Sequence, residues 1–136
     1  MLTGTPGESI LFETNFNFRT DSYQQHLHFI IAACNKDNRV LIIPVDSLRA
    51  KADRTTILQP GDHPFITHLS FMNYSQAKIV PLNHLNTLIT EHKAKEDSPL
   101  DQAILDRIRN GVCRSDRTPD GVKDFYLDVL YNTLGT

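Results

Sequence analysis

Two runs of strand-forming residues, separated by a short polar turn, constrain the fold of this chain more than any other feature. The first run covers residues 26–33 and the second covers residues 39–45, with Asn-Lys-Asp-Asn at residues 35–38 between them. Runs of this kind on either side of an Asn/Asp turn predict a β-hairpin. Because both runs are nearly continuous in apolar residues, we expect both faces of the hairpin to be covered. Pro44 cannot donate a ladder hydrogen bond, so we expect it at a sheet edge or at the end of a strand.

Shorter strand patterns lie on either side of the hairpin. Residues 9–13 predict a first strand, and residues 55–59 predict a later one. The polar segment 15–25 is rich in Asn, Thr, Ser and Gln, which is typical of a loop. Residues 46–54 form a charged connection. Together with the hairpin, these patterns indicate that about the first eighty residues are rich in β-structure.

Residues 61–80 combine turn residues, strand-forming residues and titratable side chains more densely than any other segment. Gly61 follows Pro60 and tolerates the positive φ that a turn here needs. The polar side chains that follow within ten residues are Asp62, His63, Thr67, His68 and Ser70. Beyond the turn, apolar residues bracketed by polar ones predict an extended chain. We therefore expect this segment to take part in whatever chemistry the protein performs.

After residue 80 the apolar period changes from two residues to about 3.6, which indicates helices. The apolar faces and the prolines that open them predict three helices, at about residues 81–93, 99–111 and 119–134. We expect Gly111 to stop the second helix and the charged segment 94–98 to be a link. Strand patterns followed by helix patterns predict an α+β fold in a single domain, residues 1–136. We expect a small barrel or half-barrel at about residues 8–80 and a helical part at about residues 81–134.

Composition and charge exclude several classes of protein. With 136 residues, 40% of them hydrophobic and 22% charged, the chain suits one folded domain. A formal net charge of −2 gives no overall attraction to nucleic acid or anionic membranes, so RNA binding would need a local basic patch. The apolar runs are too short to span a bilayer, and residues 1–8 lack the pattern of a signal peptide. Cys34 and Cys113 are not spaced as a CxxC pair, so we expect reduced thiols in a cytoplasmic protein.

The two hairpin strands carry short motifs that resemble a known family. His-Leu-His-Phe-Ile-Ile at residues 26–31, and Pro-Val-Asp-Ser at residues 44–47, are similar to the PemK/MazF-like plasmid-maintenance toxins. The resemblance covers about residues 8–90, and the segment 61–65 with Ser70 and Tyr74 looks like a divergent branch of such barrels. It implies a small SH3-like β-barrel that usually forms a homodimer and cuts single-stranded RNA.

The resemblance also implies where the chemistry lies. The catalytic arginine of the family would fall at His26, and its catalytic threonine or serine near Asp46 and Ser47. In that chemistry a base activates the ribose 2′-hydroxyl, and a cation stabilises the charge that builds on the scissile phosphate. Histidine acts as either an acid or a base near neutral pH, so His26 is compatible with RNA cleavage. A fixed negative charge at Asp46 would instead repel a phosphodiester.

We expect one groove to hold both the catalytic and the substrate-binding side chains. The expected catalytic residues are His26, Ser47 and His63. The expected substrate-binding residues are Asp46, Arg49, Arg54, His28 and His68. The sequence contains no phosphate-binding loop, paired-glutamate motif or setting for a cysteine nucleophile. We expect no cofactor and no bound metal.

The histidines also have other interpretations. His26 and His28 share one face of a strand, and with His63, His68 and Asp62 they would offer the ligands of a metal site. His63 would otherwise be a turn residue whose ring bonds a backbone carbonyl. These alternatives differ in whether the rings converge, which only their positions in space can decide.

The basic and aromatic side chains near the groove leave similar alternatives. Arg49, Lys51 and Arg54 belong either to a loop that contacts phosphates or to a solvated connection with internal acidic partners. Phe71 and Tyr74 are candidates for stacking on bases, although an aromatic residue in a strand belongs to the core more often.

Two functional hypotheses follow. In the first, the protein is a toxin-like or toxin-derived barrel that acts on single-stranded RNA as a metal-independent endoribonuclease. In the second, it is a non-catalytic interaction module, an antitoxin, regulatory or phage-defence type of partner, which uses the same groove to bind a protein. Converging histidines beside a positive groove would favour RNA chemistry. Scattered histidines beside a flat apolar patch would favour protein docking.

Overall fold

The structure, a computed structural model of the chain, describes residues 1–14 and 24–134. The strands are β1 (Ser9–Thr14), β2 (Gln24–Cys34), β3 (Arg39–Ser47), β4 (Ile57–Leu58), β5 (Ser70–Met72), β6 (Lys78–Pro81) and β7 (Ala94–Asp97). The helices are α1 (Leu82–Thr90), α2 (Gln102–Arg114) and α3 (Asp120–Leu134), and a 3-10 turn, η1 (Tyr74–Gln76), precedes β6. The loop expected at residues 15–25 falls almost entirely outside the described residues.

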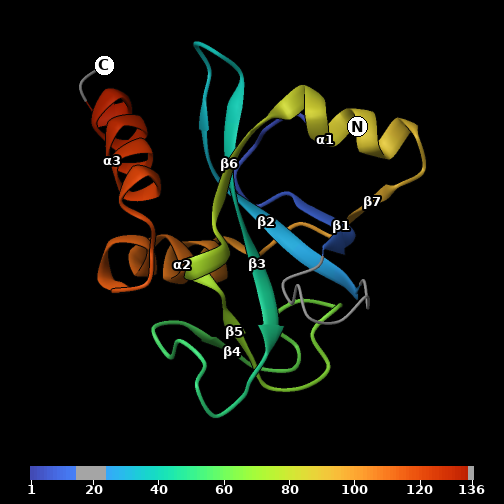
Figure 1. Cartoon of the computed structure of the whole chain (residues 1–136), viewed down its shortest axis with the longest axis vertical. Helices are drawn as coiled ribbons and strands as arrows, with labels where there is room; N and C mark the ends of the chain where they lie inside the picture. Colours follow the sequence, from blue (N-terminus) through green and yellow to red (C-terminus); the bar gives the residue numbers. More distant parts are fainter. Residues whose placement is uncertain (15–23, 135–136) are drawn as a thin grey trace.

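The seven described strands form one antiparallel sheet in the order β4-β5-β3-β2-β1-β7, and β6 pairs with β3 (Figure 1). The predicted hairpin is confirmed as its centre, with Phe29 opposite Ile43 and Cys34 opposite Arg39. The α+β class is confirmed as well. The described strands form an open sheet rather than the closed barrel that was expected, because β4 and β7 end the sheet and do not pair with each other.

Pro44 lies inside β3, not at the edge or strand end that the sequence suggested. Along one side of β3, β6 pairs with its first half and β5 pairs with its last three residues. The turn η1 lies between these two partner strands. At this point the Pro44 carbonyl accepts a hydrogen bond from the Asn73 N–H at 2.9 Å. The missing N–H of Pro44 therefore faces a stretch where no ladder hydrogen bond is required.

Both faces of the sheet are covered, as the apolar hairpin predicts. One core cluster joins the sheet to α2 and α3 and includes Phe29 and Ile108, both fully buried. A second cluster joins the opposite face to α1 and includes Ile30 and Leu85. Figure 1 shows α1 on one side of the central hairpin and α2 and α3 on the other. No helix among the described residues is long and apolar enough to cross a membrane.

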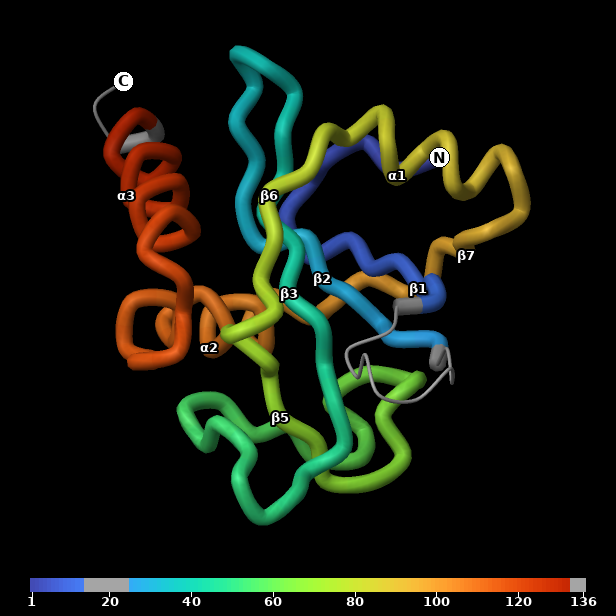
Figure 2. The backbone as a smooth tube through the Cα atoms, viewed as in Figure 1, coloured from blue at the N-terminus to red at the C-terminus, as the bar shows by residue number. Residues whose placement is uncertain are grey.

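Three local expectations are wrong. The charged link at residues 94–98 is mostly strand β7, which pairs with β1 in the register Ser9 opposite Asp97. Gly111 lies inside α2 and is buried, so it does not stop the helix. Residues 61–80 are not extended throughout, because residues 61–69 form a loop before β5. Figure 2 shows the chain between β3 and β5 looping at the end of the sheet opposite the β2–β3 turn.

Candidate functional site

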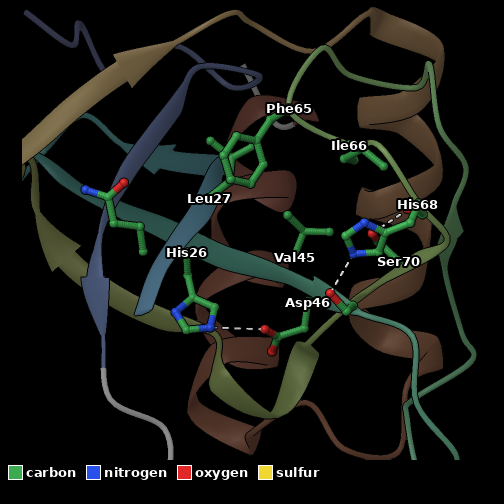
Figure 3. Close-up of a pocket in the computed structure, with 10 residues that line it drawn as sticks. His26, Leu27, Val45, Asp46, Phe65, Ile66, His68 and Ser70 are labelled. Carbon is green, nitrogen blue, oxygen red and sulfur yellow. Dashed lines mark hydrogen bonds and ion pairs between the residues drawn. The ribbon is translucent and has the colours of Figure 1, made fainter. Parts of the chain in front are cut away.

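A pocket of about 220 Å³ lies where the ends of β2 and β3 meet the loop 61–69 and the start of β5. Figure 3 shows side chains from each of these four segments around it. The polar side chains in its lining include His26, Asp46, Ser47, His68 and Ser70. The pocket therefore collects residues from both segments that the sequence singled out.

His26 and Asp46 form an imidazole–carboxylate pair at one side of the pocket. The distance between His26 Nε2 and Asp46 Oδ1 is 3.2 Å, and the two side chains are 11% and 12% exposed. The hairpin register places His28 opposite Pro44, so two residues further along the same ladder His26 faces Asp46. Because a carboxylate accepts, Nε2–H of the ring is the donor, and the pair fixes the orientation of the imidazole.

Asp46 is held on both of its oxygens. Its Oδ2 accepts a hydrogen bond from the Asn73 side chain at 2.9 Å, while Oδ1 bonds His26. Burial raises the pKa of Asp46, but the hydrogen bonds from His26 and Asn73 and the charge of Arg49 outweigh burial and lower the pKa overall. Asp46 is therefore ionised near neutral pH. Both of its oxygens are thus engaged by protein side chains, and the expected role of Asp46 in substrate binding stays a prediction.

Ser47 and His68 form a second polar pair in the same pocket. The Ser47 hydroxyl lies 2.7 Å from His68 Nε2, and the other ring nitrogen lies 3.3 Å from the Thr67 hydroxyl. Both members of the pair are exposed. Figure 3 shows the ring of His68 approaching the pocket from the loop side, across from His26. The pocket thus contains two imidazoles, each hydrogen-bonded to a side chain at the end of β3.

His63 is not part of the pocket. Its side chain is only 2% exposed, and its ring packs edge-on against Phe29 with centroids 5.4 Å apart. Nε2–H donates to the Ser98 carbonyl at 2.5 Å, and Nδ1 accepts from the Phe65 N–H at 3.0 Å. Both ring nitrogens are thus occupied by backbone groups. These contacts match the alternative in which His63 is a turn residue whose ring bonds a backbone carbonyl, and they separate it from the expected catalytic groove.

His28, which was expected to bind substrate, is also buried away from the pocket. Its side chain is 1% exposed and stacks on Phe12 with ring centroids 4.1 Å apart. Nδ1–H donates to the His26 carbonyl at 3.0 Å. Burial lowers the pKa of His28 to about 3, so the ring is neutral at physiological pH. Substrate cannot reach it without opening the core.

The basic loop contributes less than the sequence suggested. Arg54 donates to the carbonyls of Ala50 and Ala52, and is outside the pocket lining. The Arg49 guanidinium lies 5.0 Å from the centre of the Phe71 ring, and its charge helps to lower the pKa of the nearby Asp46 carboxyl. Of the two arginines expected to bind substrate, Arg49 is therefore the one whose charge affects a residue of the pocket lining, Asp46.

The four histidines and Asp62 do not assemble into a metal site. Among the described residues, no three His, Cys, Asp or Glu side chains come together as possible ligands. The reason is spatial, since His28 and His63 are buried in separate surroundings while His26 and His68 face the pocket. Asp62 instead lies 3.6 Å from Arg107 and accepts a hydrogen bond from the Gln59 N–H.

Sequence reasoning missed two features of the site. The first is Phe65, which lines the pocket and is 43% exposed, whereas the aromatic candidates Phe71 and Tyr74 are 1% and 0% exposed. The second is the hydrogen bond from the Asn73 side chain to Asp46, which depends on the turn η1. The sequence indicates the exposure of Phe65 only weakly, because the residue directly follows Pro64 in a segment rich in turn residues.

No protein-family model and no curated protein matches the chain. Among solved structures, a chain of the crystal structure of MazE-MazF (Form-II) from Deinococcus radiodurans matches with a TM-score of 0.51 and 11% sequence identity. The match covers 77% of this chain and 87% of that chain. At this identity the likeness concerns the fold alone. It supports a fold like that of the matched chain, as the resemblance of the hairpin motifs implies.

Proposed function

We propose that the protein binds single-stranded RNA and cleaves it without a metal, using His26 and His68 as the acid–base pair. The observation that carries this proposal is the pocket in which both imidazoles lie, each hydrogen-bonded to a side chain of β3. Two titratable rings around one cavity match what in-line attack by a ribose 2′-hydroxyl requires. His68 takes the role that the sequence suggested for His63.

In the proposed reaction, His26 accepts the proton of the 2′-hydroxyl as that oxygen attacks the adjacent phosphorus. The Asp46 carboxylate orients the ring and stabilises the imidazolium that forms, as in other carboxylate–histidine pairs. The bond from phosphorus to the 5′-oxygen breaks, and His68 donates a proton to the departing oxygen. The products are a 2′,3′-cyclic phosphate and a 5′-hydroxyl. Ser47 positions the His68 ring.

The charge of Asp46 does not preclude an RNA substrate. Both of its oxygens are already engaged by His26 and Asn73, so its charge is partly compensated within the protein. Arg49 adds a positive charge close enough to influence the Asp46 carboxyl, and it is exposed. We propose that Arg49 meets a phosphate of the substrate, because the molecule as a whole, with a net charge of −2, supplies no general attraction.

A protein partner is the second candidate function. Two large apolar side chains on the loop beside the pocket, Phe65 and Leu69, are 43% and 49% exposed. The MazE-MazF neighbour comes from a structure of two proteins. An antitoxin-like or regulatory protein that covers this loop would also close the pocket. This function requires no catalysis and predicts that substitutions of His26 and His68 leave partner binding largely intact.

The deciding experiment is incubation of the purified protein with mixed single-stranded RNA, with and without EDTA. We expect cleavage that EDTA does not inhibit, and a 2′-deoxy residue at the cut site should abolish it. His26→Ala and His68→Ala should each reduce the rate at least about 100-fold, since acid–base catalysis contributes about 10² to 10⁴. His84→Ala is the matched control, because His84 is exposed on α1 and outside this pocket.

Uncut RNA in the presence of folded wild-type protein would refute the cleavage hypothesis. Cleavage that survives in both His26→Ala and His68→Ala would refute this assignment of the site.

A further inference from the structure

We propose that Phe65 is a stacking platform for a nucleobase, so that the pocket binds the base next to the scissile phosphate. This inference rests on the proposed RNA substrate and adds to it a binding subsite. Phe65 lines the same pocket as His26 and His68 (Figure 3). The residue is 43% exposed. Its ring is the aromatic surface that the pocket offers to a ligand, because Phe71 and Tyr74 are buried in the core.

The backbone around Phe65 is held in place although the side chain is exposed. The Phe65 N–H donates to His63 Nδ1 at 3.0 Å, and His63 Nε2–H donates to the Ser98 carbonyl at 2.5 Å. An N–H can only donate and a carbonyl can only accept, so these two bonds fix one neutral tautomer of His63. The buried histidine therefore connects the loop 61–69 to the segment before α2.

Two further contacts immobilise the same loop. The Ile66 N–H donates to the His63 carbonyl at 2.9 Å, and the Ile66 side chain is only 5% exposed within the main core. At the other end of the loop, the Leu48 N–H donates to the Leu69 carbonyl at 3.0 Å. An aromatic ring on an anchored backbone loses less conformational freedom when a ligand binds than one on a mobile loop.

Stacking on an aromatic side chain is how proteins commonly bind the bases of single strands, because every base presents a π-face. Such stacking tolerates different sequences, because it does not depend on the edges of the base. Because His26 and His68 line the same cavity, a base on Phe65 would belong to a nucleotide at the cleaved bond. Phe65 is thus proposed to position the substrate, while the two imidazoles transfer protons.

The chain contains no tryptophan, so Phe65→Trp would introduce a single fluorescent reporter at the platform. We would titrate this variant with a short single-stranded RNA carrying 2′-O-methyl groups, which prevents cleavage. We expect saturable quenching of the tryptophan emission by the stacked base. Leu69→Trp is the matched control, because Leu69 is 49% exposed on the same loop but outside the pocket lining. That variant, and an abasic oligonucleotide with Phe65→Trp, should show little quenching.

Substitutions separate stacking from simple apolar contact. Phe65→Tyr keeps the aromatic face and should bind the oligonucleotide as the wild type does, whereas Phe65→Leu keeps an apolar side chain without that face. We expect Phe65→Leu to bind about 10- to 100-fold more weakly, as loss of one stacked base predicts. Equal affinities for the Leu and Tyr variants, or equal quenching of both tryptophan variants, would overturn the proposal. An unchanged unfolding midpoint would show that Phe65→Leu is folded.

The result also distinguishes this subsite from the proposed catalysis. Quenching and weakened binding without any RNA cleavage would support the platform and refute the acid–base chemistry. Cleavage by the wild type that is unaltered in Phe65→Leu would support the chemistry and overturn the platform. Binding of an apolar peptide at Phe65→Trp, with no response to the oligonucleotide, would overturn it in favour of a protein partner.

Discussion

The pKa of His28 is strongly lowered in the folded protein. The residue lies on the face of the sheet that carries the second core cluster. Because His28 is 1% exposed and stacks on Phe12, little water is available to solvate an imidazolium. Burial lowers its pKa to about 3, and the hydrogen bond to the His26 carbonyl offsets this only in part. Protonation of His28 therefore opposes folding.

This burial predicts a pH dependence of stability. The pKa is about 6.5 in the unfolded chain and about 3 in the folded chain, so between these values the unfolded chain binds more protons. The contribution of His28 to the free energy of unfolding is therefore fully present above about pH 6.5, where the ring is neutral in both states. It is lost as the pH falls toward 3. We expect the free energy of unfolding to drop by about 2 to 3 kcal/mol between pH 7 and pH 4.5, measured with urea. His28→Gln should lower stability at pH 7 and remove most of this dependence, and an equally steep dependence in that variant would contradict the prediction.

His63 leads to a prediction of a different kind. His63→Ala would leave the Ser98 carbonyl and the Phe65 N–H without their partner and would remove the ring from Phe29. We expect a loss of about 1 to 3 kcal/mol, the cost of unsatisfied buried polar groups, in denaturant unfolding. His84→Ala should change stability by less than about 0.5 kcal/mol, because His84 is exposed on α1. A His63 variant as stable as the His84 variant would show that the hydrogen bonds of the His63 ring contribute little to stability.

At the level of elements, α2 approaches the turn η1 closely at Gly111. The Tyr74 hydroxyl donates to the Ile108 carbonyl at 2.8 Å and lies 2.8 Å from the Thr56 hydroxyl. A Cβ at position 111 would lie 2.0 Å from the Tyr74 oxygen and 2.6 Å from the Thr56 oxygen. Glycine is needed here because the helix meets a buried polar group, not because the backbone turns.

Gly111→Ala should therefore destabilise the protein although alanine is the better helix former. We expect a loss of about 1 to 3 kcal/mol from overpacking, against a gain of about 1 kcal/mol in helix propensity. Gly121→Ala is the matched control, because its Cβ would meet nothing within 4 Å, and it should be neutral or slightly stabilising. Tyr74→Phe should reduce the cost of Gly111→Ala in a double-mutant cycle. Equal stabilities of the two alanine variants would contradict this account of the helix contact.

At the level of the whole molecule, the open sheet leaves strands β4, β6 and β7 each paired on one side only among the described residues. Edge strands invite pairing unless they are short or charged. β7 is a four-residue strand that carries Lys95, Glu96 and Asp97, which discourages such pairing. On the face of α3, Leu127 and Tyr131 are 48% and 77% exposed. The molecule therefore has apolar surface that a second copy would cover.

We predict a homodimer, as the resemblance of the hairpin motifs implies. Light scattering should give twice the 15.5 kDa mass of the chain at high concentration. Tyr131→Glu should favour the monomer if α3 is the interface, whereas Glu96→Ala should not. A mass of 15.5 kDa for the wild type at every concentration would contradict the prediction.

Local pattern in the sequence determined the hairpin and the helices. The nearly continuous apolar runs in residues 26–45 and the polar turn between them are sufficient for the hairpin, because strand pairing across a four-residue turn needs no distant partner. The helices follow in the same way from their 3.6-residue period and their opening prolines. The hairpin and the helices therefore depend on neighbours in the chain. The pair of His26 and Asp46 needs more, because the register set at the turn would place Ser47 opposite His26, and the β-bulge between Ile30 and Ala32 brings Asp46 there instead.

Only the tertiary structure decided which histidine lies in which environment. Ser47 and His68 are 21 residues apart, and His63 and Ser98 are 35 residues apart, so no local pattern brings either pair together. The β7 strand likewise exists because β1 offers it an edge, and Gly111 is buried because Tyr74 reaches it from another element. Propensity acts over a few residues, whereas burial and hydrogen bonding depend on segments that meet only after folding. His63 and His68, five positions apart on one loop, therefore differ completely in environment.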